Sequence, residues 1–305
     1  MQLYWQGTDI TEHVNITGCV HRDVSGGRCD SLELTLDHAS VWYRWGPQED
    51  DEILVTHNGY STGRLYLNAV IPLGDQYRVL ATSTRRAAAR KAWGSFSETT
   101  LKRIFDVCAA ECQMEGKLYG IDGNLAYPYA LRRREGAAAF LTRIGKWEGL
   151  CVKAYDGAFL GISVDFAQEI EPAISLEITS AQEGVTYRRR DNVKYTSLTV
   201  MTPYAQAVAR DAGASGSNAE VFTHLPAMNN AQAGRWARGL LLMHNRRAED
   251  LTIEQTLDTS LSALTRVDVT GGTDMTGEWI ADEVEHDFVN ARTTAKLLRV
   301  VRTIQ

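Results

Sequence analysis

The residues that most often catalyse reactions or bind metals are spread along this chain without the spacing that either task requires. The seven histidines stand apart, at positions 13, 21, 38, 57, 224, 244 and 286. There is no HExxH or HxH motif, and the five cysteines (Cys19, Cys29, Cys108, Cys112 and Cys151) form no CxxC pair. The sequence also contains no P-loop, no GxGxxG dinucleotide-binding motif and no GxSxG nucleophile motif. The sequence therefore predicts no metal site, no cofactor and no catalytic nucleophile.

Carboxylates are plentiful, but their arrangement is typical of solvated surfaces. Wall-cleaving enzymes place two carboxylates across a sugar cleft. Here the acidic residues occur as a run at positions 49–52, or alternate along a strand-like stretch at 282–287. Two arginine triplets, 132–134 and 188–190, could anchor an anionic partner or a phosphate, or could lie in exposed turns. We therefore expect no catalytic pair and no enzyme activity.

Length and composition indicate a globular chain of two or three domains. The 305 residues are 44% hydrophobic and carry a formal net charge of −6, which does not suit a protein that wraps nucleic acid. No apolar run approaches the ~20 residues that span a bilayer, and the first residues do not resemble a signal peptide. With an odd number of cysteines, this pattern predicts reduced thiols and synthesis in the cytoplasm.

Residues 1–85 show the alternation of half-buried strands. Apolar and polar residues alternate strictly over 31–37, and a second apolar run follows at 53–55. Asn58-Gly59 separates that run from an alternating stretch at 64–68, which predicts a hairpin. Several strands joined by tight turns favour a barrel or a sandwich.

Helical spacing begins after position 85. Helices are predicted over 100–112, with Ser97 or Thr99 as the cap and Gly116 as the stop, and over 137–147, ending at Gly149. Asp156-Gly157 predicts a hairpin that follows the second helix. Residues 86–172 are therefore expected to form a small α+β domain.

Strand patterns return over residues 173–305. The segment 209–220 is small and polar, as in an exposed loop, and one helix is predicted over about 230–249 with Asn230 as its cap. Its apolar face includes Trp236, Leu240 and His244, which we expect at an interface between subunits. Residues 175–179 (SLEIT) echo 31–35 (SLELT), which is weak support for an internal duplication.

A series of residues in the first domain resembles the baseplate hub family of contractile phage tails, which includes the late control protein D group and the N-terminal half of VgrG spikes. The series comprises Asp30, Leu32, Leu34, Leu36, Trp42, Trp45, Ile53, Val55 and Gly63. The stretch from 138 to 157, with AAFLTRIGKWEG followed by VKAYDG, is also similar. The resemblance covers residues 1–170 well and the remainder mainly by architecture.

This resemblance implies a fold and a role. The expected fold is a β-rich α+β chain with two tail-tube-like β-barrels, at 1–85 and 173–305, and the small α+β domain, 86–172, between them. Members of the family form homotrimers whose six barrels mimic a hexameric ring. The expected partners are the tail tube protein, the central spike protein, other baseplate proteins and the tape measure protein. DNA would pass through the ring without specific binding, and the location would be a virion or tail-like particle.

Two other functions stay open from the residues alone. Trp42, Trp45 or Trp93 could be exposed and bind glycans, as in a carbohydrate-binding module of a cell-wall-binding tail protein. A wall hydrolase would need two facing carboxylates, and the sequence offers no motif for it.

Overall fold

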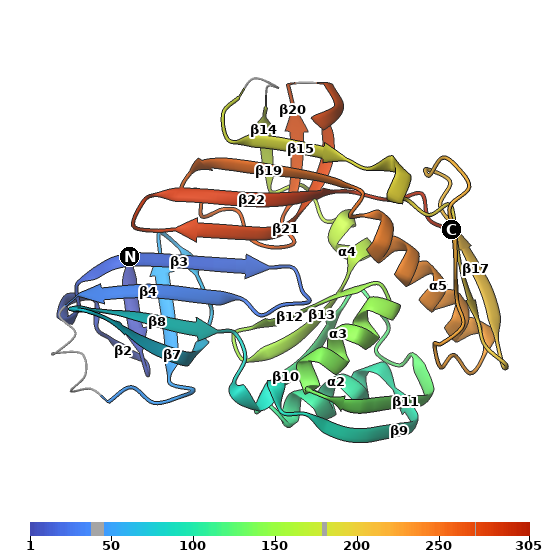
Figure 1. Ribbon diagram of the computed structural model, residues 1–305, viewed down its shortest axis with the longest axis horizontal. Coiled ribbons are helices and arrows are strands. Elements are labelled where there is room, and N and C mark those ends of the chain that lie inside the picture. Colours follow the sequence, from blue (N-terminus) through green and yellow to red (C-terminus); the bar gives the residue numbers. More distant parts are fainter. Residues whose placement is uncertain (38–45, 179–181, 272) are drawn as a thin grey trace.

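The computed structural model describes residues 1–37, 46–178, 182–271 and 273–305. Strands from the first and last parts of the chain form one large sheet, while the middle of the chain supplies helices and smaller sheets (Figure 1). The predicted signature residues Trp42 and Trp45 lie outside the described residues.

The first region is built from strands, as the alternation predicts. They are β1 (Gln2–Trp5), β2 (Thr8–Asp9), β3 (Ile16–Val24), β4 (Ser31–Asp37), β5 (Glu52–His57), β6 (Tyr60–Ser61), β7 (Leu65–Leu73) and β8 (Gln76–Thr82), with a 3-10 turn η1 (Thr11–His13). The hairpin expected at Asn58-Gly59 joins β5 to β6, and both residues have positive φ, as a tight hairpin turn requires.

The middle region alternates strands and helices. Its elements are η3 (Arg86–Ala89), β9 (Ala92–Thr100), α2 (Leu101–Ala110), β10 (Glu115–Tyr119), β11 (Ala126–Glu135), α3 (Ala137–Trp147), β12 (Leu150–Tyr155), β13 (Ala158–Ser163) and α4 (Val164–Glu169). The cap of α2 is Thr100 rather than Ser97 or Thr99, because β9 pairs with β11 as far as Thr100. The chain leaves α2 through Gln113 at φ 56°, and Gly116 lies inside β10.

The last region returns to strands with one long helix. Its elements are β14 (Ile174–Glu177), β15 (Val185–Arg189), η4 (Asp191–Val193), β16 (Ser197–Met201), β17 (Gln206–Arg210), β18 (Ala219–Phe222), α5 (Asn230–Asn245), β19 (Glu249–Thr256), β20 (Arg266–Thr270), η5 (Thr273–Met275), β21 (Gly277–Asp287) and β22 (Arg292–Arg299). Helix α5 is shorter than predicted because β19 begins at Glu249, and its cap is Asn229 rather than Asn230. Both ends of the expected loop 209–220 are in strands.

The large sheet joins the first and last regions through one pair of strands. Its main path runs β15-β19-β22-β21-β3-β4-β8-β7-β5-β1-β2, and among the described residues this path does not close into a barrel. Strand β21 pairs with β22 along one edge and shares its other edge between β20 and β3. A bulge at Asp282 lies between the two partners. The β3–β21 pairing therefore joins the two strand-rich parts that the sequence analysis predicted as separate domains.

Each end of this sheet surrounds its own apolar core, and we call the strands of the first region the first sheet and those of the last region the last sheet. The first core contains Leu3, Leu34 and Val79, and the last contains Leu251, Val267 and Trp279. The two segments that echo each other in sequence are paired differently: β4 is antiparallel to β3 and β8, while β14 is parallel to β20. The echo therefore does not mark equivalent strands.

A third core belongs to the middle region, and α5 is part of it. Helices α2, α3 and α5 pack together with strands β12, β13, β16 and β17 around it. Figure 1 shows α5 and the sheet of β16–β18 beside the middle region, away from the strands that surround the last core. No helix in the described part of the chain is long and apolar enough to cross a membrane.

Candidate functional site

The apolar residues of the predicted signature form the core of the first sheet. Leu32, Leu34, Leu36, Ile53 and Val55 are all buried in the same cluster. They alternate with half-exposed residues along β4 and β5, so their spacing follows from the two-residue period of a strand. Their role is to hold the sheet together rather than to contact a ligand.

Gly63, another residue of the predicted signature, has a backbone conformation that favours glycine. It has a positive φ of 66°, and a Cβ placed on it would lie 2.9 Å from the Tyr155 ring and 3.2 Å from the Asp156 nitrogen. Both neighbours belong to the β12–β13 hairpin of the middle region. A side chain at this position would push the first sheet away from the middle region.

Asp30 takes part in a buried ionic cluster at the same junction. The ammonium of Lys153, on β12, forms ion pairs with Asp30 (3.0 Å) and with Asp23, at the end of β3. Asp30 also accepts from the Val24 nitrogen (3.0 Å), and Asp23 accepts from the Ala263 nitrogen (2.9 Å). We call Asp23, Asp30 and Lys153 the ionic junction. It ties the middle region to the first sheet and to the loop before β20.

The ionic junction places one cation between two carboxylates away from water. Burial raises the pKa of Asp30, and the charge of Asp23 adds to this effect although Lys153 opposes it. Burial alone would lower the pKa of Lys153, but the two carboxylates outweigh it and raise that pKa. The ammonium is therefore charged at neutral pH and is what makes the buried carboxylates tolerable.

Two buried histidines lie next to the ionic junction. His21 Nδ1 is 2.8 Å from the Tyr60 hydroxyl, and the ring of His286 packs edge-on against Tyr60. Burial lowers the pKa of His21 to about 3, and it also lowers the pKa of His286. Both imidazoles are therefore neutral at physiological pH, where they serve as packed core groups.

A second junction joins α3 to α5 around the carboxylate of Glu148. This side chain is 1% exposed and accepts from Trp236 Nε1 (2.8 Å), from the Tyr127 hydroxyl (2.6 Å) and from Arg235 Nε (3.0 Å). Burial and the adjacent Glu148 charge raise the pKa of Tyr127, so this phenol remains a donor. Trp147 and Trp236 pack with ring centres 4.6 Å apart. We call this group the aromatic junction.

Of the three expected interface residues of α5, the structure buries Trp236 and Leu240 inside the chain, while His244 is half-buried. Trp236 is 0% exposed, Leu240 belongs to the same core, and His244 stacks on Tyr195 with ring centres 4.1 Å apart. Gly239 allows this packing, because a Cβ there would meet the Trp147 carbonyl at 2.2 Å. The apolar face of α5 is thus a contact within one chain, and Trp236 and Leu240 are not accessible to another subunit.

Several of the carboxylates considered for catalysis are engaged in ion pairs. Glu49 binds Arg86, Glu52 binds Arg85, and Glu283 binds both Arg22 and Arg28. Among the described residues no group of histidines, cysteines and carboxylates could hold a metal ion.

Sequence comparison alone identifies no relative: no protein-family model matches the chain, and no curated protein is similar to it. Solved structures do share its fold. The 43 kDa tail protein of prophage MuSo2 from Shewanella oneidensis matches with a TM-score of 0.74 over 98% of this chain and 97% of that protein, at 12% identity. A tail protein from Neisseria meningitidis matches with a TM-score of 0.76 over 98% and 95% of the two chains, at 11% identity.

A third structure extends the fold to secretion systems. An Escherichia coli component of the type VI secretion system, described as structurally similar to the phage T4 tail proteins gp27 and gp5, matches with a TM-score of 0.62. The match covers 99% of this chain and 78% of that protein at 10% identity. The chain therefore shares its fold with these tail proteins and with this type VI secretion component along nearly its whole length.

Proposed function

We propose that this chain is a structural hub protein in the baseplate of a contractile phage tail or tail-like particle. The main support is that the chain shares its fold with two tail proteins, one of them from a prophage, along 98% of its length. The buried residues described above join the parts of the chain to one another. In this role the chain makes and breaks no bond, so it is not an enzyme.

The proposed assembly is a homotrimer that forms a pseudo-hexameric ring. Each chain has two strand-rich parts with separate cores, and in the proposal each acts as one tail-tube-like barrel. Three chains then present six such units to the sixfold tail tube on one face and a threefold centre to the spike protein on the other. The ring would also contact other baseplate proteins and the tape measure protein.

The ring would line a channel through which DNA or effector proteins pass. The net charge of −6 supports passage without specific binding, because a phosphate backbone is not attracted to a negatively charged wall. The chain would be made in the host cytoplasm and would end up in the baseplate of the particle.

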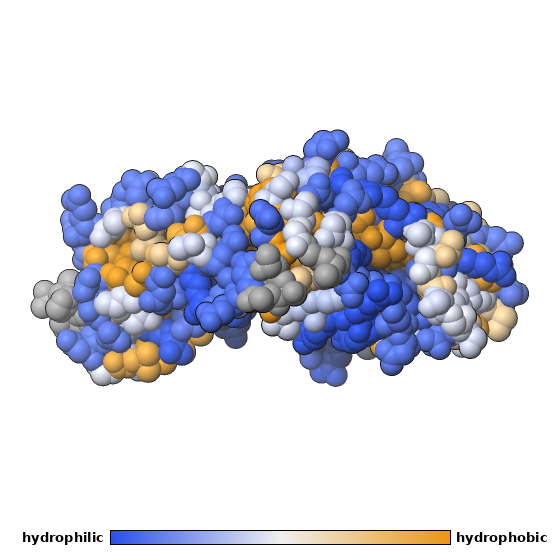
Figure 2. All heavy atoms as spheres, turned by 90° about the horizontal axis from the view of Figure 1, so that it is seen from above, coloured by the Kyte–Doolittle hydropathy of each residue, from blue (hydrophilic) through white to orange (hydrophobic). Residues whose placement is uncertain are grey.

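Contacts with neighbours would use the exposed apolar residues rather than α5. Ile71 and Leu73 are exposed near the tip of the β7–β8 hairpin, and Val208 and Val221 are exposed on the two strands that flank β16. Figure 2 shows one face of the molecule as mainly hydrophilic, with several separate apolar patches. Scattered patches of this kind suit a subunit that meets several neighbours.

Subunit stoichiometry tests the proposal. The mass of the purified protein should be measured by light scattering, alone and with the spike protein encoded beside it. We expect a threefold mass, and electron micrographs that show rings with a central hole. A strict monomer under both conditions would contradict the hub and favour the glycan-binding alternative.

One observation keeps that alternative testable. Trp93, on β9, is 70% exposed, whereas Trp5, Trp147, Trp236 and Trp279 are buried. A glycan-binding module should lose binding to cell-wall fragments when Trp93 is replaced by Ala, while a hub should keep its trimer mass in that variant.

A further inference from the structure

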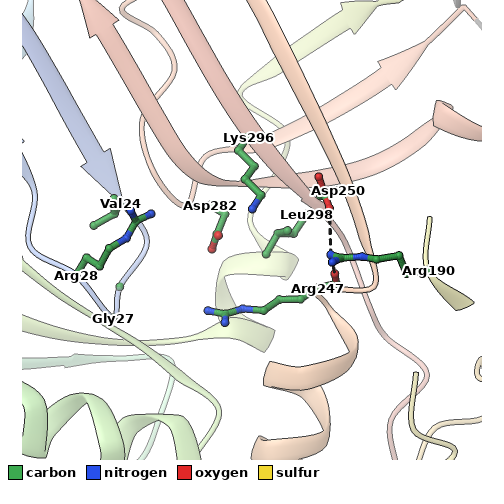
Figure 3. Close-up of a pocket in the computed structure, with 10 residues that line it drawn as sticks. Val24, Gly27, Arg28, Arg190, Arg247, Asp250, Asp282, Lys296 and Leu298 are labelled. Atoms are coloured by element: carbon green, nitrogen blue, oxygen red, sulfur yellow. Dashed lines mark hydrogen bonds and ion pairs between the residues drawn. The ribbon is translucent and has the colours of Figure 1, made fainter. Parts of the chain in front are cut away.

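A pocket of about 420 Å³ lies where the first sheet, the last sheet and the end of α5 meet, apart from the two junctions. Figure 3 shows its walls, which come from the turn after β3, the residues after β15 and α5, and strands β19, β21 and β22. The lining residues are Val24, Gly26, Gly27, Arg28, Arg190, Arg247, Asp250, Asp282, Lys296 and Leu298. The last residue of the arginine triplet 188–190 thus lines this pocket, because Arg190 directly follows β15.

Both carboxylates of the pocket already have partners. Asp250 is 1% exposed and forms ion pairs with Arg188 (2.8 Å) and Arg190 (3.2 Å). Asp282 accepts from the Ser25 hydroxyl (2.6 Å) and lies 3.7 Å from the buried guanidinium of Arg246. Arginine side chains therefore already neutralise these two carboxylates, without the other cations of the pocket.

Two cations of the pocket have no ion-pair partner among the described residues. Lys296 and Arg247 form no salt bridge or side-chain hydrogen bond within the described parts of the chain. Glu283 lies opposite Lys296 on the neighbouring strand, but Arg22 and Arg28 occupy its carboxylate. In Figure 3 the two side chains reach from different walls toward the space beside Asp282. Because the whole chain is acidic, this local positive charge does not follow from overall composition.

The backbone of the turn after β3 adds further donors. The N–H groups of Gly26 and Gly27 make no hydrogen bond with another described residue. Gly26 is held against β12, since a Cβ there would lie 2.8 Å from the Val152 carbonyl oxygen, whereas Gly27 has a φ of +80° and open space around it. Successive free N–H groups in a glycine turn form a concavity that suits an anion.

The buried guanidinium of Arg246 lies beside Asp282, one of the pocket residues. Arg246 is 1% exposed, and its Nε and Nη2 atoms have no hydrogen-bond partner in the described structure. Burying a guanidinium with unsatisfied donors is costly unless negative charge lies close by. Asp282 supplies only one such charge, at 3.7 Å.

We propose that this pocket binds a phosphate-type oxyanion, held by Lys296, Arg247 and the Gly26-Gly27 turn. The ion would bridge the turn after β3, strand β22 and the connection between α5 and β19, and so link the first region to the last. Ligand binding at such a place stabilises the folded arrangement in proportion to ligand concentration. The inference does not depend on the hub function, since it concerns one chain and one anion.

Calorimetry and thermal unfolding of the full chain test this site with inorganic phosphate against chloride at constant ionic strength. Phosphate should raise the unfolding temperature and give a titratable heat. Lys296→Gln and Arg247→Gln should each weaken binding about tenfold, as expected when a charge-assisted hydrogen bond is lost. Lys91→Gln and Arg133→Gln are the matched controls, because both residues are exposed and lie outside the pocket, and they should leave binding unchanged.

A second arm with methyl phosphate separates a free ion from a phosphate carried on a larger molecule. Comparable affinity for both ligands would indicate a carried phosphate, and binding of inorganic phosphate alone would indicate the free ion. The proposal is overturned if phosphate and chloride are indistinguishable at equal ionic strength. It is also overturned if Lys91→Gln weakens binding as much as Lys296→Gln. Unfolding in chloride shows whether each variant is folded.

Discussion

The two buried junctions of this molecule hold its middle region in place by different chemistry. The ionic junction joins β12 to the first sheet through one ammonium and two carboxylates. The aromatic junction joins α3 to α5 through packed indoles around the single carboxylate of Glu148. In the first, each charge depends on its partner. In the second, most of the stabilisation comes from apolar area, and the hydrogen bonds fix the orientation.

The largest effect should follow removal of the cation from the ionic junction. Lys153→Met keeps most of the side-chain volume but leaves Asp23 and Asp30 buried without a counter-charge. Breaking a buried pair in this way costs about 3–5 kcal/mol. The free energy of unfolding from denaturant titration measures it.

The matched control for that change removes all three charges together. Combining Lys153→Met with Asp23→Asn and Asp30→Asn should recover most of the lost stability, since no unpaired charge remains. A loss of less than about 1 kcal/mol for Lys153→Met alone, as at exposed ion pairs, would show that the junction does not depend on charge.

The aromatic junction should respond less to the loss of its polar contact. Trp236→Phe keeps an aromatic ring but removes the N–H donor to the Glu148 carboxylate, which is expected to cost about 2–3 kcal/mol. Trp279→Phe is the control, because Trp279 is equally buried and donates to a neutral carbonyl, that of Met275 (2.8 Å). Equal losses in both variants would mean that the charge of Glu148 is unimportant.

Acid should weaken the region around the ionic junction through His21. The pKa of His21 is about 3 in the folded protein, against 6.5 for an ordinary histidine. Between these two pH values the unfolded chain binds more protons than the folded one, so the free energy of unfolding falls as the pH falls. Between pH 7 and pH 5 the share of His21 is about 2 kcal/mol. The raised pKa of Asp30 acts in the opposite direction, so the comparison with a variant is what isolates His21.

The variant His21→Gln should therefore lose about 2 kcal/mol less than the wild type over the same pH range. Denaturant titrations of both proteins at the two pH values give the difference directly. Identical losses would show that folding does not lower the pKa of His21.

The elements were predictable where local pattern decides them. The alternation over 31–37 gives β4, the Asn58-Gly59 and Asp156-Gly157 turns give hairpins, and helical spacing gives α2, α3 and α5. The caps were misplaced by one to three residues, because strand pairing rather than side-chain preference decides where β9 ends and α2 begins.

The long-range contacts were not predictable from the sequence. The pairing of β3 with β21 joins residues more than 250 positions apart, and no local pattern specifies it. Lys153 stands between apolar neighbours in a strand, where a lone lysine usually faces water. It is buried only because a turn from the first region brings two carboxylates to it. Trp236 was correctly placed on an apolar face, but the partner of that face is α3 of the same chain.

The smallest effect should come from the exposed ion pair that spans the same boundary as the ionic junction. Arg64, beside β7, donates to Asp156 of the β12–β13 turn (2.8 Å), and their side chains are 47% and 54% exposed. Arg64→Ala should cost less than about 1 kcal/mol, and high salt should reduce even that. Because this pair and Lys153 connect the same two regions, denaturant titration of the two variants compares exposed with buried charge directly. A loss in Arg64→Ala as large as in Lys153→Met would mean that the surface pair holds the regions together.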